Sequence, residues 1–228
     1  MAGLHECHIT VDNGSMTLNL FQDEPREQGI APGATLLRGA ALAQGARLVE
    51  AVEALTRQSP FRHMMTPGGF TMSVAMTNCG GLGWITDRRG YRYVPDDPET
   101  GQPWPAMPEA LAALARGAAQ EAGFAGFQPD ACLINRYVPG TRLTLHQDGD
   151  EVDFSAPIVS VSLGIPATFL FGGCARKDKT ARVPLFHGDV VVWGGVDRKR
   201  YHGVMPLKEA VHPLVGAQRM NLTFRKAG

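Results

Sequence analysis

The chain of 228 residues has no closely spaced cysteines, no excess of basic residues and no long apolar run, features that mark several protein classes. Its four cysteines lie far apart with no CxxC pair, which argues against a zinc knuckle and a small disulfide scaffold. Lys plus Arg equals Asp plus Glu, 22 against 22, so the basic excess usual for a dedicated nucleic-acid binder is missing, although a local basic face stays open. No apolar run is long enough to span a membrane. We therefore expect one domain in the reducing cytoplasm, with no membrane partner.

The first 15 residues stand apart by composition. They contain His5, Cys7 and His8 but no basic start followed by an apolar stretch, so they do not resemble a signal peptide. We expect residues 1–15 to be a disordered leader, with translation starting at Met16, or a remnant of cloning. A second metal site on the two histidines and the cysteine is the alternative. Residues 16–228 then form a single domain.

Two helices are predicted in the first half of the domain. Residues 41–57 carry apolar side chains at helical spacing, and Pro60 stops the pattern. Pro108 opens the second helix and Gly123 closes it, the expected asymmetry of helix ends. Residues 60–105, between the helices, are rich in Gly, Pro and aromatic residues, which favours short strands and turns.

The character changes from residue 129 onward, where short β-rich runs are separated by Gly and Pro. The runs are ACLINRYV, TRLTLHQD, APIVSVSLG, ATFLFGG, RVPLFHG, DVVVWGG, YHGVMPL and MNLTFR. Many short strands at this spacing predict an antiparallel sandwich or barrel. No crossover helices intervene, so a parallel α/β sheet is not expected. The sequence also lacks a Walker or Rossmann glycine loop.

A metal site is predicted from the histidines of this half. Because residues two apart on a strand point to the same face, His146 and Asp148 should project together. His202, in a strand-like run after a glycine-rich turn, supplies a third ligand. Two imidazoles and one carboxylate form the facial triad of non-haem Fe(II) oxygenases. His187 is expected to be a structural turn histidine and His212 a solvent-exposed one. Alone, an HxD pair is also compatible with an ordinary surface strand.

The last predicted strand, RMNLTFR, carries two arginines on one face. Arg219, Asn221, Thr223 and Arg225 share that face because strand side chains alternate. Two buried arginines need anions, and a dicarboxylate supplies them, since each guanidinium can pair with a carboxylate in two parallel hydrogen bonds. A solvated outer face is the alternative reading. With the triad, the arginines point to a 2-oxoglutarate site.

The sequence resembles the AlkB-like 2-oxoglutarate dioxygenases, which demethylate alkylated nucleic-acid bases. The resemblance runs from about Met16 to the end. It is carried by SPFRHMMTPGG, TMSVAMTNCG, GYRYVPDDP, PWPAMP, FQPDACLINRYVPG, LHQDGDE, APIVSVSLG, HGDVVVWGG and NLTFR. It implies a mainly β fold with flanking helices: a double-stranded β-helix (jelly-roll) core at about 129–228 and an N-terminal nucleotide-recognition lid at about 60–105.

The resemblance also implies roles for individual residues. His146, Asp148 and His202 match the catalytic iron ligands. The positions that match the 2-oxoglutarate site are Asn135, Tyr137, Arg219, Asn221 and Arg225. The positions that match contacts to the base or its strand are Trp84, Tyr91, Arg92, Tyr93, Asp150 and Arg176. Gly149 and Phe70 depart from the familiar pattern, which has a charged residue and a tyrosine there.

The implied base contacts also make physical sense. A base inside a duplex must be extruded to reach a metal, and a flat side chain such as Trp84 could then stack on it. Asp150 could accept a hydrogen bond from an exocyclic amino group and favour a cationic base. The plain alternatives are a core tryptophan at Trp84, ordinary strand alternation at Tyr91 and Tyr93, and a solvated loop at Arg176.

The expected activity is oxidative demethylation of N1-methyladenine and N3-methylcytosine with Fe(II), O2 and 2-oxoglutarate, which releases formaldehyde, succinate and CO2. The expected partners are alkylated single-stranded or double-stranded DNA, with RNA as a further class, and the enzyme is expected to be a monomer. One rival is a dioxygenase acting on a protein side chain or a metabolite. The other is a non-catalytic jelly-roll module that binds nucleic acid and has an incidental HxD pair.

Overall fold

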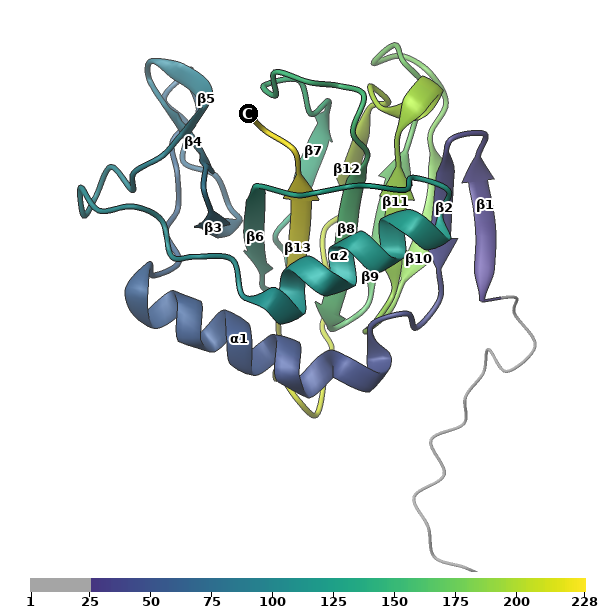
Figure 1. Cartoon of the computed structure of the whole chain (residues 1–228), viewed down its shortest axis with the longest axis horizontal. Coiled ribbons are helices and arrows are strands. Elements are labelled where there is room, and N and C mark those ends of the chain that lie inside the picture. Colours follow the sequence, from purple (N-terminus) through teal and green to yellow (C-terminus); the bar gives the residue numbers. More distant parts are fainter. Residues whose placement is uncertain (1–25) are drawn as a thin grey trace, which may run out of the picture.

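The computed structural model describes residues 26–228, which build two larger antiparallel sheets, a separate two-stranded sheet and two α-helices (Figure 1). The larger sheet has the order β1 (Glu27–Ala31), β2 (Ala34–Leu37), β11 (Val190–Trp193), β8 (Ile158–Gly164), β13 (Arg219–Arg225), β6 (Ala131–Tyr137) and β3 (Ala75–Gly80). The smaller sheet has the order β10 (Ala181–Leu185), β9 (Ala167–Phe171), β12 (His202–Val204) and β7 (Leu143–His146). The expected mainly β fold with flanking helices is therefore confirmed, the nucleotide-recognition lid stays a prediction, and the expectation for residues 1–15 lies outside the described residues.

The two helices cover the outer face of the larger sheet (Figure 1). Helix α1 (Gly45–Gln58) buries Leu48, Val49, Val52 and Leu55, a stripe at helical spacing, and ends before Pro60. Helix α2 (Glu109–Glu121) begins directly after a proline and buries one face, made of Leu111, Leu114, Ala115, Ala118 and Ala119. Short 3-10 turns precede α1 at Leu42–Gln44 and follow β11 at Gly195–Asp197. Of the described helices, none is long and apolar enough to cross a membrane.

A second apolar core fills the space between the two sheets. Strand β13 serves both cores because its side chains alternate between its faces. The set that packs toward the helices is Met220, Leu222 and Phe224. The set that lines the space between the sheets is Arg219, Asn221, Thr223 and Arg225. The alternation predicted for this strand is therefore present, and its polar face is buried rather than solvated.

Three local features differ from the sequence-based expectations. Strands β1 and β2 pair as a hairpin across Pro32 and Gly33, a region in which the sequence had indicated no strand. Strand β7 ends at His146, so Asp148 lies in the following loop, because the polar run QDGDE cannot continue a half-buried strand. His212, expected to be exposed, is half-buried and stacks on His187 with ring centroids 4.3 Å apart.

A separate two-stranded hairpin stands beside the sheets. It consists of β4 (Gly83–Asp87) and β5 (Gly90–Val94), and we call it the β4–β5 hairpin (Figure 1). Trp84 and Tyr93 are directly opposite each other in its register, as are Thr86 and Tyr91. The hairpin falls within residues 60–105, for which short strands were expected.

Candidate active site

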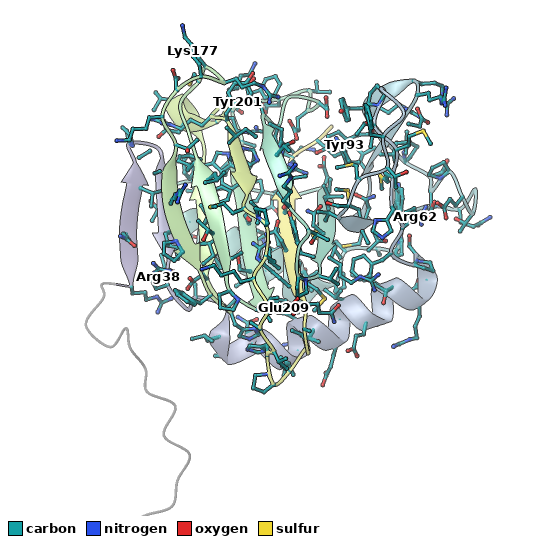
Figure 2. All side chains as sticks on the ribbon, turned by 180° about the vertical axis from the view of Figure 1, so that it is seen from behind. Arg38, Arg62, Tyr93, Lys177, Tyr201 and Glu209 are labelled. Atoms are coloured by element: carbon teal, nitrogen blue, oxygen red, sulfur yellow. The ribbon has the colours of Figure 1, made fainter. Side chains whose placement is uncertain are left out.

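A cavity of about 380 Å³ lies between the sheets and is lined by residues of both sheets and of the β4–β5 hairpin. The lining includes all of the residues predicted for the metal and the cosubstrate, namely His146, Asp148, His202, Asn135, Tyr137, Arg219, Asn221 and Arg225. Tyr93 and Tyr201 mark the end of the molecule where the hairpin lies, and Glu209 lies at the opposite end (Figure 2).

Three side chains in this cavity form a group that could hold a metal ion. His146 and His202 are cross-strand partners of β7 and β12, and the loop after β7 brings Asp148 to them. One ligand atom from each of the three lies within 4.8 Å of the others. The Asp148 carboxylate faces both imidazoles, with Oδ1 3.7 Å from His146 Nε2 and Oδ2 3.8 Å from His202 Nε2. Among the described residues this is the only such group.

The two imidazoles are held with one ring nitrogen free to bind a metal. His146 Nδ1 lies 2.9 Å from the Thr144 carbonyl oxygen and His202 Nδ1 lies 3.0 Å from that of Arg200, so each Nδ1–H donates to the backbone. Each Nε2 then carries a lone pair directed at Asp148, as in known metal-binding histidines. Burial lowers the pKa of His202 to about 4, which keeps that ring neutral at pH 7.

Asp148 is ionised although it is buried. Burial alone would raise the pKa of its carboxyl group, but Arg225 and the two histidines outweigh burial, and the pKa lies well below its ordinary value. Arg225 donates two hydrogen bonds to Asp148 Oδ2, from Nε at 2.9 Å and from Nη2 at 2.7 Å. Two imidazoles and one carboxylate are the donors that suit Fe(II) with open positions for other ligands.

Arg219 is fully buried, yet its guanidinium has unused donors. Nη2 donates to Ser162 Oγ at 2.9 Å, and the guanidinium carbon lies 5.1 Å from the centre of the Tyr137 ring. Nε and Nη1 have no hydrogen-bond partner within residues 26–228, and burial lowers the pKa of this arginine. A buried cation with free donors facing a cavity calls for an anionic ligand. A carboxylate of 2-oxoglutarate meets that requirement.

The neighbouring polar residues support the same site. Asn221 donates from Nδ2 to Ser160 Oγ at 2.8 Å and to the Val161 carbonyl at 3.0 Å, so its side chain is fixed. The buried Asn135 Oδ1 has no partner within the described part of the chain and lines the cavity. Tyr137 is opposite Arg219 in the register of β6 and β13.

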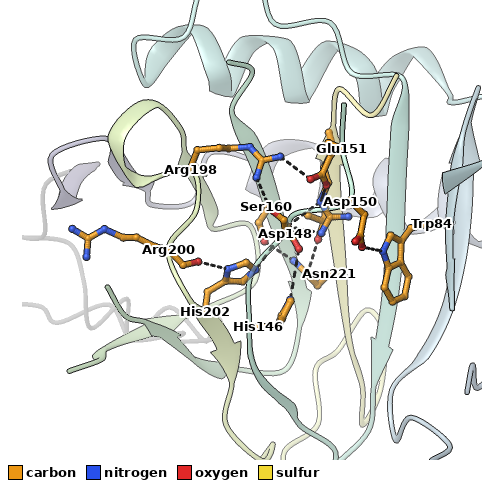
Figure 3. A network of polar contacts seen from close by, with 12 residues as sticks. Trp84, His146, Asp148, Asp150, Glu151, Ser160, Arg198, Arg200, His202 and Asn221 are labelled. Carbon is orange, nitrogen blue, oxygen red and sulfur yellow. Dashed lines mark hydrogen bonds and ion pairs between the residues drawn. The ribbon is translucent and has the colours of Figure 1, made fainter. Parts of the chain in front are cut away.

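The residues predicted to contact a base lie at the hairpin side of the cavity. Trp84 and Tyr91 stack with ring centroids 5.7 Å apart and planes 17° apart, and both line the cavity. Trp84 Nε1 donates to Asp150 Oδ2 at 2.8 Å, which links the hairpin to the loop that carries Asp148 (Figure 3). The Arg176 guanidinium lies 5.3 Å from the centre of the Tyr201 ring, also at the cavity wall.

Two predicted residues are placed elsewhere. Arg92 is outside the cavity lining and forms an ion pair with Asp87, Nη2 to Oδ2 at 2.7 Å, within the hairpin. Tyr93 does not line the cavity, and its hydroxyl donates to Glu151 Oε1 at 2.9 Å. Because side chains alternate along a strand, Arg92 points to the face of β5 opposite to that of Tyr91. This alternation could be read from the sequence alone.

Sequence reasoning missed two buried charged residues beside the site. The Glu151 side chain is 2% exposed, and that of Arg198 is 3% exposed, with Arg198 Nη2 3.2 Å from Glu151 Oε2 (Figure 3). Arg198 also donates to the Asp148 carbonyl at 3.1 Å. In the sequence, Glu151 and Arg198 are marked only by lying close to Asp148 and His202. Charged surface residues lie equally close to such segments, so this position alone does not reveal a buried charge.

Comparison with known proteins identifies the family. The model of the 2OG-Fe(II) oxygenase superfamily matches residues 33–225. The α-ketoglutarate-dependent (that is, 2-oxoglutarate-dependent) dioxygenases AlkB of Salmonella typhimurium and Escherichia coli are each 58% identical to this chain, over 92% of it and 98% of their own length. The solved structure of OsALKBH1 superposes with a TM-score of 0.78 at 30% identity, covering 88% of this chain and 99% of that one.

More distant relatives match about half of the chain. They include a DNA N(6)-methyladenine demethylase of Arabidopsis thaliana, 40% identical over 109 residues, and a tRNA demethylase of Schizosaccharomyces pombe, 30% identical over 124 residues. The family model and the two AlkB proteins, together with the His–Asp–His group and the unused donors of Arg219, show that the chain belongs to the 2OG-Fe(II) oxygenase superfamily as an AlkB-like dioxygenase that depends on Fe(II) and 2-oxoglutarate.

Proposed function

We propose that this enzyme oxidatively demethylates N1-methyladenine and N3-methylcytosine in DNA, with RNA as a further substrate class. The products are formaldehyde, succinate, CO2 and the restored base, which is direct-reversal repair. The observation that carries the proposal is the juxtaposition of the Trp84–Tyr91 stack and the Asp150 carboxylate with the metal-binding group in one cavity. Relatives named as DNA and tRNA demethylases support the same substrate class.

In this proposal His146 Nε2, His202 Nε2 and the Asp148 carboxylate hold Fe(II). When bound with 2-oxoglutarate, the metal supplies dioxygen activation coupled to decarboxylation of the cosubstrate. Arg225 donates a hydrogen bond to Asp148, so it binds the carboxylate of 2-oxoglutarate that lies nearer the metal. Arg219, whose free donors have no carboxylate partner within the described residues, serves the distant carboxylate.

The base-binding roles follow from flatness and charge. An extruded base that stacks on Trp84 gains about 1–3 kcal/mol, whatever its identity. Selectivity then comes from Asp150, since one of its carboxylate oxygens holds the Trp84 indole and the other remains for an exocyclic amino group. Because N1-methyladenine and N3-methylcytosine are cationic, this carboxylate also favours them over normal bases.

We further propose that residues 60–105 form the nucleotide-recognition lid and residues 129–228 the catalytic jelly-roll core of one domain. The lid supplies Met72, Met76, Trp84 and Tyr91 to the cavity wall. We also propose that the enzyme acts as a monomer. Cys79 and Cys132 are cross-strand partners and remain free thiols, which fits the reducing cytoplasm.

The test is formaldehyde release from oligonucleotides that carry N1-methyladenine, as single-stranded DNA, duplex DNA and RNA. Wild-type enzyme with Fe(II), 2-oxoglutarate and air should release formaldehyde, and Asp148→Ala should release none. Glu209→Gln, an exposed site at the far end of the molecule (Figure 2), should match wild type. Release from methylated peptides but from no oligonucleotide would reject the proposed substrate, and activity in Asp148→Ala would reject the ligand assignment.

A further inference from the structure

The β4–β5 hairpin docks onto the metal-site loop through two neighbouring hydrogen bonds. Trp84 and Tyr93 are cross-strand partners, and they donate to the consecutive residues Asp150 and Glu151, at 2.8 and 2.9 Å. Asp150 and Glu151 follow the metal-site residue Asp148 by only two and three positions. The position of the hairpin is therefore tied to the loop that carries this carboxylate.

The two hydrogen bonds differ in their surroundings. The Trp84–Asp150 bond lies at the exposed side of the cavity, where a base can enter. The Tyr93–Glu151 bond is partly buried: Tyr93 lies outside the cavity lining, whereas Glu151 belongs to it, and burial raises the pKa of Tyr93, which keeps the hydroxyl protonated as a donor. A base in the cavity can thus reach the outer bond without touching Tyr93, the donor of the inner one.

The inner bond continues to the metal-site carboxylate through buried charges. Glu151 Oε1, which accepts from Tyr93, also lies 3.3 Å from Arg225 Nε. Arg225 in turn makes two hydrogen bonds to Asp148. If Tyr93 withdraws, Glu151 Oε1 loses its hydroxyl donor and competes with Asp148 for Arg225. A shift of the hairpin therefore changes how firmly Arg225 orients Asp148.

Arg198 fixes the loop at both ends, and Figure 3 shows its contacts at the Asp148–Glu151 end. Its Nη1 donates to the Asp148 carbonyl and its Nε to the Ala156 carbonyl, each at 3.1 Å, while Nη2 lies 3.2 Å from Glu151 Oε2. It lies four residues before His202, so it joins the segment leading to one metal-site residue to the loop of another. Arg198 does not line the cavity and acts only through other residues.

We propose that Tyr93, Glu151 and Arg198 are positioning residues that couple docking of the β4–β5 hairpin to the placement of Asp148 and Arg225. The consequence is that 2-oxoglutarate turnover is productive only while the hairpin is docked. The inference rests on the proposed function, because the nucleotide is what the hairpin closes over. Undocking yields turnover in which succinate forms without a matching amount of formaldehyde, and an added two-electron reductant such as ascorbate consumes the oxidising equivalent that the methyl group does not.

The first measurement needs neither nucleic acid nor turnover. Hydrogen exchange of residues 83–94 and 146–156 is compared in wild type, Tyr93→Phe and Arg38→Lys, each loaded with Mn²⁺ and 2-oxoglutarate. Tyr93→Phe should raise exchange in both segments by about fivefold, the effect of one lost hydrogen bond. Arg38→Lys alters a partly buried ion pair with Asp189 away from the cavity, so it should leave both segments unchanged. A rise confined to residues 83–94 would overturn the coupling.

The second measurement takes formaldehyde and succinate from one reaction on a methylated oligonucleotide. Tyr93→Phe should lower formaldehyde per succinate by about fivefold, and Tyr93→Phe with Glu151→Gln should be no worse than Glu151→Gln alone. Arg198→Lys should also lower the ratio, because lysine lacks the fork that reaches both carbonyls. An unchanged ratio in Tyr93→Phe, or additive losses in the double variant, would overturn the proposal. A wild type that releases no formaldehyde contradicts the proposed function instead, and the exchange experiment still decides the coupling.

Discussion

Replacing Arg219 with methionine should stabilise the apoprotein while it abolishes tight binding of 2-oxoglutarate. Arg219 is fully buried, and two of its donor nitrogens have no partner within residues 26–228. Each such unmade hydrogen bond costs about 1–3 kcal/mol. Methionine removes that cost and loses one hydrogen bond to Ser162 and the contact with the Tyr137 ring, each worth about 1 kcal/mol. The unfolding free energy should therefore be unchanged at the least and should rise by up to about 4 kcal/mol.

The loss of binding follows from the same two donors. Each charge-assisted hydrogen bond to a carboxylate contributes about 1.5–3 kcal/mol, so two of them account for a loss of about 100-fold to 10,000-fold in affinity. Urea unfolding with and without Mn²⁺ and 2-oxoglutarate measures both effects. The reasoning is refuted if the Arg219→Met apoprotein loses more than about 1 kcal/mol of stability, or if 2-oxoglutarate still stabilises it as it does wild type.

Arg225 provides the matched contrast on the same face of the same strand. It is also buried, but it neutralises Asp148 and contacts Glu151. Arg225→Met leaves a buried carboxylate without its partner and should destabilise the apoprotein by about 3–5 kcal/mol. Two arginine-to-methionine changes six residues apart should therefore shift the urea midpoint in opposite directions.

Three further outcomes are expected. Trp84→Ala should weaken binding of methylated single-stranded DNA by about 1–3 kcal/mol in fluorescence anisotropy, with anaerobic 2-oxoglutarate binding unchanged; equal losses of both would contradict a stacking role. Asp150→Asn should reduce the preference for cationic over neutral methylated bases by about tenfold in competition assays; an unchanged preference would remove Asp150 from base selection. Burial lowers the pKa of His187 and His212 in the folded state. Below the ordinary pKa of 6.5 the unfolded chain therefore binds more protons than the folded one. The free energy of unfolding is greatest above pH 6.5 and falls as the pH drops below it. His212→Gln should reduce this loss below pH 6.5, measured by thermal unfolding, and an unaltered pH profile would exclude the histidine pair as its source.

Much of the fold was predictable because it depends on local periodicity. The stripe of α1, the proline before α2 and the alternation of β13 each follow from spacing alone, and the two buried arginines followed from that alternation. Strands β1 and β2 were missed because they are short and their pattern is interrupted by Pro32 and Gly33. Their pairing depends on β11, a neighbour far away in the sequence.

The site was predictable to the extent that ligand chemistry limits residue type. Histidine and aspartate at the right spacing indicated a metal, and the resemblance supplied the aromatic residues of the hairpin. Glu151 and Arg198 were missed because a buried charge is recognisable only through its partner, which here is 47 residues away. No local pattern distinguishes them from surface charges such as Lys199.

The pairing of His146 with His202 across β7 and β12 has a consequence for folding in the cell. A slip of one residue between these two strands would turn His202 to the opposite face and dismantle the metal site. Only the correctly paired chain can then retain iron, and each bound ion makes that pairing harder to reverse. Iron supply would therefore set not only how many copies are active but also how long each copy resists unfolding and proteolysis.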